Sequence, residues 1–441
     1  EMKLRLVLQC ALISIASSNV GRFWQITDLH LDFHYDRLET DTKKVCPSTY
    51  GFEALEPGVW GDYKCDSTWK LINSSIHAMR DIEANPDFIL WTGDDTLHTT
   101  DEDRFLGEAK VVETIKNITD LIQQVFPQTK VFSALGNHDY QPKNNMPPGP
   151  SEILTEIAQI WRPWMTEDAF QLFNITGYYA DDTTGNSLLK VIVLNTNLWD
   201  NYNDHISGEG DPSGQFSWLR SQLEGARRSG KKVYIIGHIS PGFFELYENE
   251  FYLHENYISN YIAIVQEYYD VISGQFFAHN HMDSYRMFYN KDKQPISVLF
   301  LAPGVTPRVG TREGSVNPGI RLFQYNRTNM QIKNYDQYYF NLAAANKHPI
   351  EAEWTLEYSS STGFEISDLS PTSMHLLLER MKKADLGCDP TTHGCENNRL
   401  FQRYVRFHSV SYDYSSCNDT CHRNHICAIQ DVDVALHGRC I

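Results

Sequence analysis

The chain has 441 residues, of which 41% are hydrophobic and 21% are charged. This composition is typical of a globular protein and excludes disordered, collagen-like and coiled-coil classes. Its 38 Lys and Arg against 56 Asp and Glu give a formal charge of −18, which argues against a nucleic-acid polymer as partner because phosphate binding needs a basic surface. An anionic substrate would need a local source of positive charge, and a bound metal is the obvious candidate.

The first eighteen residues have the pattern of a secretory signal peptide;. Lys3 and Arg5 form a short basic start, the run at 4–15 is mostly apolar, and small residues follow at 16–18. The apolar run is too short for a transmembrane helix. The alternative interpretation is a buried strand or helix. We therefore expect residues 1–18 to be cleaved and the mature protein to be secreted and extracellular.

Short apolar runs bounded by polar or turn residues predict six β-strands. These runs are 23–27, 88–92, 130–134, 190–195, 232–237 and 298–301. Helical patterns lie between several of them, at 69–82, 105–126 and 152–161;. The alternation of strand and helix predicts an α/β domain that binds its ligands at strand ends.

The sequence changes character from about residue 350. It becomes helical, with 373–383 as the clearest helix, and it carries six of the eight cysteines that remain after signal cleavage. We interpret this segment as a small disulfide-rich subdomain. The predicted organisation is a signal peptide at 1–18, a catalytic domain at 19–345 and a helical cysteine-rich subdomain at 346–441.

The cysteines and glycosylation sequons agree with export. Of nine cysteines, Cys10 leaves with the signal peptide, and an even number in a secreted chain predicts disulfides;. Loop proximity favours the pairs Cys46–Cys65, Cys388–Cys395, Cys417–Cys421 and Cys427–Cys440. Zinc is the competing interpretation for the closely spaced set at 417, 421 and 427. N-x-S/T sequons predict glycosylation at Asn73, Asn117, Asn174, Asn326 and Asn418;.

Five clusters of carboxylate, amide and imidazole side chains follow predicted strands. In chain order they are Asp28-Leu29-His30, Gly93-Asp94-Asp95, Gly136-Asn137-His138-Asp139, Gly237-His238 and His279-Asn280-His281. Residues i and i+2 share a face of a strand, so both members of a D-x-H or H-x-H pair can reach one metal. Each cluster alone is weak, but five in this order predict a two-metal centre. Two metals clamp phosphoryl oxygens in an in-line displacement and lower the pKa of bound water towards about 7.

This series of motifs resembles the calcineurin-like metallophosphoesterase family and, within it, the acid sphingomyelinase-like phosphodiesterases, most closely the 3b type. Supporting stretches include FWQITDLHLD, PDFILWTGDDTLH, ALGNHDY, YIIGHISPGFFE, SGQFFAHNHMDS and SYDYSSCNDTCHRNHICAIQ. The resemblance covers nearly the whole mature chain. It implies an α/β fold in which helices flank a calcineurin-like β-sandwich, followed by a small helical, disulfide-rich C-terminal subdomain.

The resemblance also implies two Zn²⁺ ions, with other divalent first-row metals as alternatives. The first ion would be held by Asp28, His30, Asp94 and His281, and the second by Asp94, Asn137, His238 and His279. His98 and His138 match the two non-ligand histidines of the family, and either would stabilise transition-state charge or protonate the leaving oxygen. Asp139 would either orient His138 or be a solvated turn residue.

One position departs from the family pattern. Ala278 stands where Gly usually precedes the H-x-H motif. If the backbone there has a positive φ, a Cβ atom would add strain. That strain would disturb the geometry of His279 without changing which residues are the ligands.

The function that the resemblance implies is a secreted, zinc-dependent phosphoric diester hydrolase that acts by in-line attack of a metal-bridging hydroxide. Two substrate classes compete: small soluble compounds such as nucleotides and cytidine-diphosphate alcohols, and sphingomyelin or another membrane phospholipid. Acid sphingomyelinase carries a saposin domain ahead of its catalytic domain, whereas the first metal-binding strand here starts soon after the predicted cleavage point. We therefore expect the soluble class. A catalytically inactive regulatory protein is the alternative, but it predicts missing ligands and all seven ligand positions are filled.

Membrane attachment is a separate question. The 3b-type relatives are associated with a glycolipid anchor added near a hydrophobic C-terminal tail, and the sequence ends at Ile441 without such a tail;. We expect a soluble monomer with a small phosphorylated substrate and no nucleic-acid partner. Membrane anchoring is expected only if the sequence continues beyond residue 441.

Overall fold

The computed structural model describes residues 19–46, 48, 53–98, 106–182, 185–309 and 314–441. The predicted signal peptide at 1–18 lies outside these residues. In the part of the chain that the structure describes, no helix combines the length and the apolar character needed to cross a bilayer.

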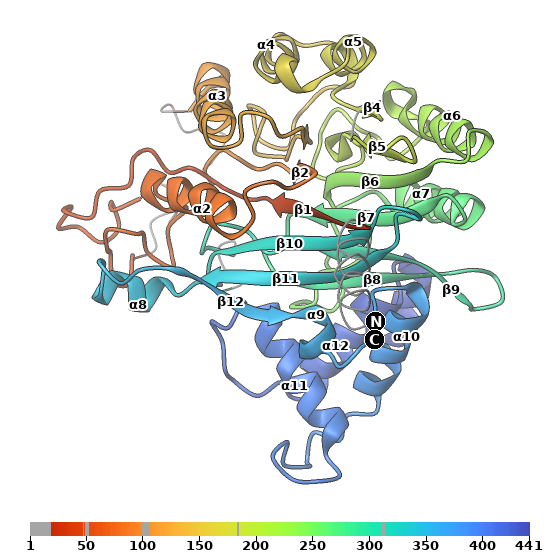
Figure 1. The fold of residues 1–441 in the computed structure, drawn as a ribbon. Helices are drawn as coiled ribbons and strands as arrows, with labels where there is room; N and C mark the ends of the chain where they lie inside the picture. Colours follow the sequence, from red (N-terminus) through yellow and green to blue (C-terminus); the bar gives the residue numbers. More distant parts are fainter. Residues whose placement is uncertain (1–18, 47, 49–52, 99–105, 183–184, 310–313) are drawn as a thin grey trace, which may run out of the picture.

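Two six-stranded sheets pack face to face through the middle of the molecule (Figure 1). The first sheet has the order β12 (Trp354–Ser359), β11 (Ile332–Phe340), β10 (Gly319–Asn326), β1 (Val20–Ile26), β2 (Phe88–Trp91), β3 (Val131–Ser133). The second has the order β4 (Tyr179–Asp181), β5 (Leu189–Val193), β6 (Lys232–Ile239), β7 (Ile272–Ala278), β9 (Pro295–Leu301), β8 (Ser284–Tyr289). Strands β1 to β3 are mutually parallel, as are β5, β6, β7 and β9. All six strands expected from the sequence are therefore present.

Helices cover the outer faces of both sheets and form the C-terminal part of the molecule. Those between β1 and β7 are α2 (Trp69–Ile82), α3 (Glu108–Val125), α4 (Glu152–Trp161), α5 (Glu167–Thr176), α6 (Gln215–Arg228) and α7 (Glu255–Tyr268), with short 3₁₀ turns at Arg162–Trp164, Thr196–Leu198 and Pro212–Gly214. Helices α2 and α4 have the predicted bounds, and each begins where a side chain caps its N-terminus. The backbone N–H of Leu71 donates to Thr68 Oγ1 and that of Leu154 donates to Ser151 Oγ, which satisfies an N-terminal donor of each helix;.

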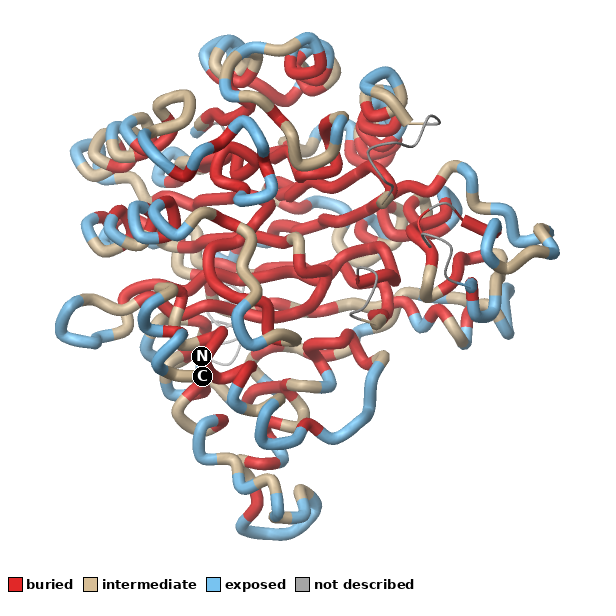
Figure 2. The backbone as a smooth tube through the Cα atoms, turned by 180° about the vertical axis from the view of Figure 1, so that it is seen from behind, coloured by how far each residue is buried: buried red, intermediate tan, exposed pale blue. Residues whose placement is uncertain are grey.

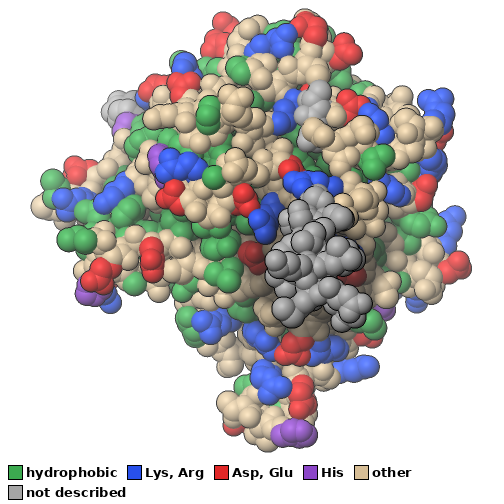
Figure 3. All heavy atoms as spheres, in the orientation of Figure 1, with side chains coloured by type: hydrophobic (Ala, Val, Ile, Leu, Met, Phe, Trp, Pro, Cys, Tyr) green, Lys and Arg blue, Asp and Glu red, His purple; other side chains and the backbone are tan. Residues whose placement is uncertain are grey.

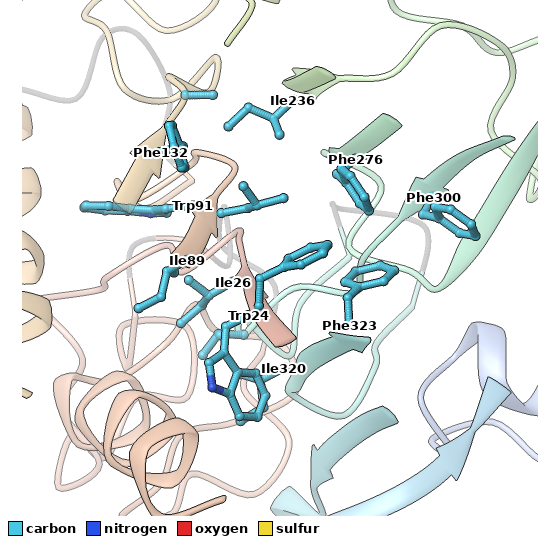
Figure 4. Packing of buried hydrophobic residues seen from close by; sticks show 14 of the residues in the cluster. Trp24, Ile26, Ile89, Trp91, Phe132, Ile236, Phe276, Phe300, Ile320 and Phe323 are labelled. Carbon is cyan, nitrogen blue, oxygen red and sulfur yellow. The ribbon is translucent and has the colours of Figure 1, made fainter. Parts of the chain in front are cut away.

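Aromatic side chains fill the space between the two sheets (Figure 4). Phe23 of β1 is fully buried, and its ring centroid lies 5.0 Å from that of Phe323 in the same sheet. The Phe276 ring of β7, in the opposite sheet, packs edge-on against Phe23 at 5.3 Å. Along β6, alternate residues face this core and the layer of α6 and α7, as expected from the two-residue period of a strand;. Figure 2 shows the result, with buried strands inside and exposed segments on the outer helices.

The C-terminal region starts in the sheet before it becomes helical. Strand β12 lies within the segment expected to be a helical subdomain, but it pairs antiparallel with β11 and completes the first sheet. The helices are α8 (Leu342–Lys347), α9 (Ser360–Gly363), α10 (Pro371–Lys382), α11 (Glu396–His408), α12 (Asp419–Gln430) and α13 (Val434–Cys440). Of these, α10 contacts β9 and α12 contacts β8, so the helices cover the edge of the second sheet. The boundary at 345 remains a prediction.

The four disulfides join the pairs favoured by loop proximity. They are Cys46–Cys65, Cys388–Cys395, Cys417–Cys421 and Cys427–Cys440. Three of them hold the C-terminal helices and their connections. Because Cys417, Cys421 and Cys427 are all disulfide-bonded, the structure contradicts the zinc alternative for this set.

Acidic and basic side chains are interspersed over the face shown in Figure 3, and the coloured residues of this face form no continuous basic stripe. This distribution agrees with the formal charge of −18.

Candidate metal centre

The carboxyl ends of the parallel strands meet at one edge of the sandwich and bring the predicted site residues together. Asp28 and His30 follow β1, Asp94 follows β2, Asn137 and His138 follow β3, His238 lies near the end of β6, and His279 and His281 follow β7. The ligand-type atoms of Asp28, His30, Asp94 and His281 lie within 4.8 Å of one another, as do those of Asp94, His238 and His279. The two groups share Asp94.

The Asp94 carboxylate lies between imidazoles from the two sheets. Its Oδ2 atom is 3.4 Å from His30 Nε2 and 3.0 Å from His238 Nε2. Its other oxygen accepts the backbone N–H of His138 at 2.8 Å. Asn137 adds an amide oxygen, since its Oδ1 lies 3.2 Å from His238 Nε2. One carboxylate oxygen therefore faces both halves of the cluster.

Backbone carbonyls orient three of the imidazoles. The Nδ1 atoms lie 2.7 Å from the carbonyl of Thr96 for His30, 2.8 Å from that of Thr92 for His238 and 2.6 Å from that of Arg308 for His281. A carbonyl only accepts, so each Nδ1 carries a proton, and Nε2 is the atom that each ring directs at the cluster. This is the arrangement by which proteins fix a metal-binding histidine.

The backbone is strained at five of the predicted ligands. Positive φ values occur at Asp28 (47°), His30 (40°), Asp94 (59°), His279 (78°) and His281 (57°). Each such residue costs on the order of 1–3 kcal/mol and is typical of functional sites. Ala278 ends β7 in the extended conformation and has no positive φ. The backbone strain expected at Ala278 is therefore absent there and occurs instead at His279 and His281.

Two glycines let the loops after β2 and β3 come into contact. A Cβ atom on Gly136 would lie 2.0 Å from Asp94 Oδ1. A Cβ atom on Gly93, which has a φ of 90°, would lie 2.4 Å from the backbone nitrogen of Gly136. No larger side chain fits at either position, so the spacing of Asp94 and Asn137 depends on both glycines.

Asp139 has neither of the roles expected for it. It is fully buried, and its Oδ2 accepts the backbone N–H groups of Asp94 at 2.9 Å and Gly136 at 2.8 Å. Its Oδ1 accepts the N–H of Asp95 at 2.8 Å. Asp139 therefore ties the loop after β2 to the loop after β3 and neither orients the His138 ring nor lies in solvent.

His98 and His138 lie beside the cluster. The His98 ring centroid is 4.0 Å from that of His30 and 4.5 Å from that of His138. Asp66 fixes His98, because its Oδ1 lies 2.9 Å from His98 Nδ1 and its Oδ2 accepts the backbone N–H of His98 at 2.6 Å. Sequence reasoning missed Asp66, which follows Cys65 in an irregular loop and belongs to no motif. It comes near His98 only through the fold.

Burial and the carboxylates act in opposite directions on the pKa values of the histidines. Burial lowers the pKa of His30, His98, His138 and His279 well below the ordinary value. At His238 burial also lowers the pKa, but the charges of Asp94 and Asp28 and the bonds to Asp94 and Thr92 together raise it to about 9. At His281 burial is likewise outweighed by the combined effect of Asp28, Asp94 and the bond to Arg308, and the pKa is raised. The cluster thus favours positive charge at two points, both beside a carboxylate.

The donor set fits divalent cations. Both carboxylate oxygens of Asp28 are buried, and their nearest charged neighbour is the His281 imidazole, whose Nε2 lies 3.3 Å from Oδ1. Burying a carboxylate in this way is costly unless a cation compensates its charge. Imidazole nitrogens with carboxylate and amide oxygens suit zinc and other first-row metals.

A cleft of about 150 Å³ opens beside the cluster. It is lined by His98, Phe244, Tyr252, His279, Asn280, His281 and Val309. A larger groove of about 740 Å³ lies between α2, α3 and the segment after His30, but none of the predicted ligands lines it. The small cleft, as formed by the described residues, opens onto the candidate centre.

Two family models match the chain. Calcineurin-like phosphoesterase matches residues 21–283, and the acid sphingomyelin phosphodiesterase C-terminal region matches residues 294–441. Acid sphingomyelinase-like phosphodiesterase 3b of Mus musculus is 43% identical over 432 residues, covering 97% of this chain and 91% of that protein. Cyclic GMP-AMP phosphodiesterase SMPDL3A of Homo sapiens is 37% identical, and the match covers 96% of this chain and 90% of that protein. Sphingomyelin phosphodiesterase of Bos taurus is 30% identical, and the match covers 93% of this chain and 64% of that protein.

The Asp139→Asn variant tests the loop connection. Whichever way the amide turns, its NH₂ group faces at least one of the three N–H groups that the carboxylate accepts, so we expect unfolding to require about 2–3 kcal/mol less. The measurement is a guanidinium titration. Asp389→Asn is the control, because Asp389 also accepts a backbone N–H but is exposed. Equal stability of Asp139→Asn and wild type would contradict the role of Asp139.

Proposed function

The chain belongs to the calcineurin-like phosphoesterase family and, within it, to the acid sphingomyelinase-like phosphodiesterases, and on this basis we propose that it is a zinc-dependent phosphodiesterase of small soluble substrates. The observation that carries the proposal is the pair of donor groups sharing Asp94. A site for a single metal ion would need only one such donor group. Two groups with a common carboxylate suit the two-ion chemistry of phosphoryl transfer.

We propose that Asp28, His30, Asp94 and His281 hold the first ion and that Asp94, Asn137, His238 and His279 hold the second. When bound, the ions supply Lewis-acid polarisation of the phosphoryl group and a water activated for in-line attack. The chain contributes the orientation. The carbonyls of Thr96, Thr92 and Arg308 keep the Nε2 atoms of three histidines directed at the cluster.

His98 and His138 are the proposed catalytic groups for the leaving oxygen. With the His98 Nδ1 proton donated to Asp66, Nε2 is the atom of His98 that exchanges a proton;. His98 also lines the cleft, which places it next to any bound substrate. Asp66 fixes the orientation of the His98 ring, because it holds both the Nδ1 atom and the backbone N–H of His98.

The proposed substrates are nucleotides and related phosphodiesters or phosphoanhydrides, including cytidine-diphosphate alcohols. Two observations support this class. The cleft of about 150 Å³ is open to solvent and is lined by the predicted ligands His279 and His281, so a phosphoryl group in solution can reach the centre. A relative 37% identical to the chain is named as a cyclic GMP-AMP phosphodiesterase. Sphingomyelin is the second candidate, because another relative is named as a sphingomyelin phosphodiesterase.

We propose that the protein is exported and glycosylated. Four disulfides are typical of an oxidising compartment;. None of the five sequon asparagines, Asn73, Asn117, Asn174, Asn326 and Asn418, is buried. Asn418 caps α12 through its Oδ1, which accepts the Cys421 N–H and leaves its nitrogen available for a sugar.

The Asp94→Asn variant tests the shared carboxylate. Since one side chain serves both ions, we expect the metal content to fall at both sites together, from about two ions per chain to less than one. The measurement is mass-spectrometric metal analysis of purified protein. Asp95→Asn is the matched control, because Asp95 is the next residue and equally buried, and its Oδ1 accepts the indole Nε1–H of Trp91 instead. Loss of a single ion from Asp94→Asn would refute the bridge.

The His138→Ala variant separates catalysis from metal binding. We expect it to retain both ions, because no metal ligand is removed. Its turnover number should fall by a factor on the order of 10²–10⁴, because a proton donor is removed. His77→Ala, a histidine of α2 bonded to the Asn73 carbonyl, is the control. A metal-free His138→Ala would make His138 a ligand.

The substrate class is tested by kcat/KM for a nucleotide and for sphingomyelin in vesicles, at matched acidic and neutral pH. We expect the nucleotide to be the better substrate, because it reaches the cleft from solution whereas a vesicle lipid must first leave the bilayer. Sphingomyelin in detergent, measured in parallel, separates recognition of the head group from extraction. A tenfold advantage of the vesicle lipid would overturn the proposal.

A further inference from the structure

The groove of about 740 Å³ between α2, α3 and the segment after His30 lies apart from the proposed chemistry. The two helices are neighbours on the outside of the first sheet (Figure 1). Leu31 and Phe33 line the groove from the segment after β1, and Leu121 lines it from α3. Its wall is therefore apolar in part, and a molecule that fills it would bury this apolar surface.

Two sequon asparagines line the same groove. Asn73 of α2 and Asn117 of α3 each begin an N-x-S/T sequon, and neither is buried. The other three sequon asparagines do not line the groove. An N-linked glycan on either helix would thus start at the edge of the groove. Because it is covalently attached, its effective concentration there would be high.

The direction in which helical side chains lean separates the two asparagines. A residue on a helix covers the surface over the turn N-terminal to its own Cα atom. For Asn73 this turn carries Trp69, which lies four residues earlier and also lines the groove;. For Asn117 the groove continues towards Asp120 and Gln124, on its C-terminal side. A glycan on Asn73 is therefore directed into the groove, and a glycan on Asn117 is directed away from it.

Trp69 offers a surface that suits a sugar. Its side chain is 42% exposed, although tryptophan has a large apolar area that favours burial. One face of an N-acetylglucosamine ring carries C–H groups, which pack on the flat face of an indole and leave water. The hydroxyl and acetamido groups of the sugar need polar partners, and Asp120 and Gln124 provide them on the α3 side;. The volume of the groove lies within the range of small-ligand pockets, roughly 300–1,000 Å³.

We propose that the groove holds the protein's own glycan. The first N-acetylglucosamine on Asn73 stacks on Trp69, and the following sugar continues between α2 and α3. The inference rests on the glycosylation proposed above and gives one glycan a defined place on the protein. The covered wall includes Leu31, the residue directly after the predicted ligand His30. The glycan therefore packs against the segment that leads away from the candidate centre.

The first test measures glycan release from the folded protein. Full-length protein secreted from animal cells is treated with a peptide-N-glycosidase without denaturant, and peptide mass spectrometry gives the release rate at each sequon. For Trp69→Leu we expect release at Asn73 to become about tenfold faster, because less apolar area holds the sugar in place. Trp69→Phe should keep the slow rate because an aromatic face remains. Release at Asn174 and Asn326, measured in the same molecules, should not change.

The second test observes the same contact from the side of the protein. The contribution of Trp69 to acrylamide quenching of the tryptophan fluorescence is the difference between a protein and its Trp69→Leu variant. We expect this contribution to rise in Asn73→Gln, because the indole loses its cover. Asn117→Gln is the matched control, since it removes a glycan from the other edge of the same groove. It should leave the contribution unchanged.

The outcomes separate the groove contact from the proposed glycosylation. Unchanged release at Asn73 in Trp69→Leu, or equally accelerated release at Asn73, Asn174 and Asn326, overturns the inference. A rise in quenching in Asn117→Gln as large as that in Asn73→Gln also overturns it. If no sequon carries a glycan, the proposed glycosylation itself fails. If other sequons are glycosylated and Asn73 is not, or if Asn73 is glycosylated and the Trp69 measurements do not change, only the groove contact fails.

Discussion

The candidate centre depends on the distance between two sheets. Asp94 belongs to the first sheet, and one of its oxygens faces His30 from that sheet and His238 from the other. The aromatic core sets this distance, since Phe23 and Phe276 meet edge to face between the sheets. A dense core transmits any change of side-chain volume. Packing well away from the chemistry therefore determines whether one carboxylate can serve both halves of the cluster.

The elements that carry the site were predictable because their pattern is local. A short apolar run followed by a polar cluster marks β1, β2 and β3; β2 and β3 are buried throughout, and β1 is buried from Phe23 onward. The predicted runs do not include β4, β7, β8, β10, β11 and β12, each of which contains polar residues or glycine. Arg321 of β10 and Gln337 of β11 are fully buried and bond to each other, so their burial depends on a partner in the neighbouring strand. Hydrogen bonding between two strands cannot be predicted from the sequence of one strand alone.

The same distinction applies within the site. The predicted ligands lie in motifs, and the structure brings their side chains together, although no metal identity follows from that. Asp66 and Tyr252 reach the cluster from loops without a motif, the first by bonding His98 and the second by packing on His279. The roles predicted for Asp139, orienting His138 or lying in solvent, were both wrong. Its actual partners are three backbone N–H groups that only the fold brings together.

The left-handed backbone at the predicted ligands has a consequence for the evolution of the protein. At Asp28 and His30, with φ values of 47° and 40°, glycine would relieve strain that the native side chains impose. Each such replacement would also remove a proposed ligand. Selection for a more robust fold and selection for turnover therefore act in opposite directions at the same codons, a trade-off that is typical of active sites. Stabilising substitutions should accumulate elsewhere in the chain.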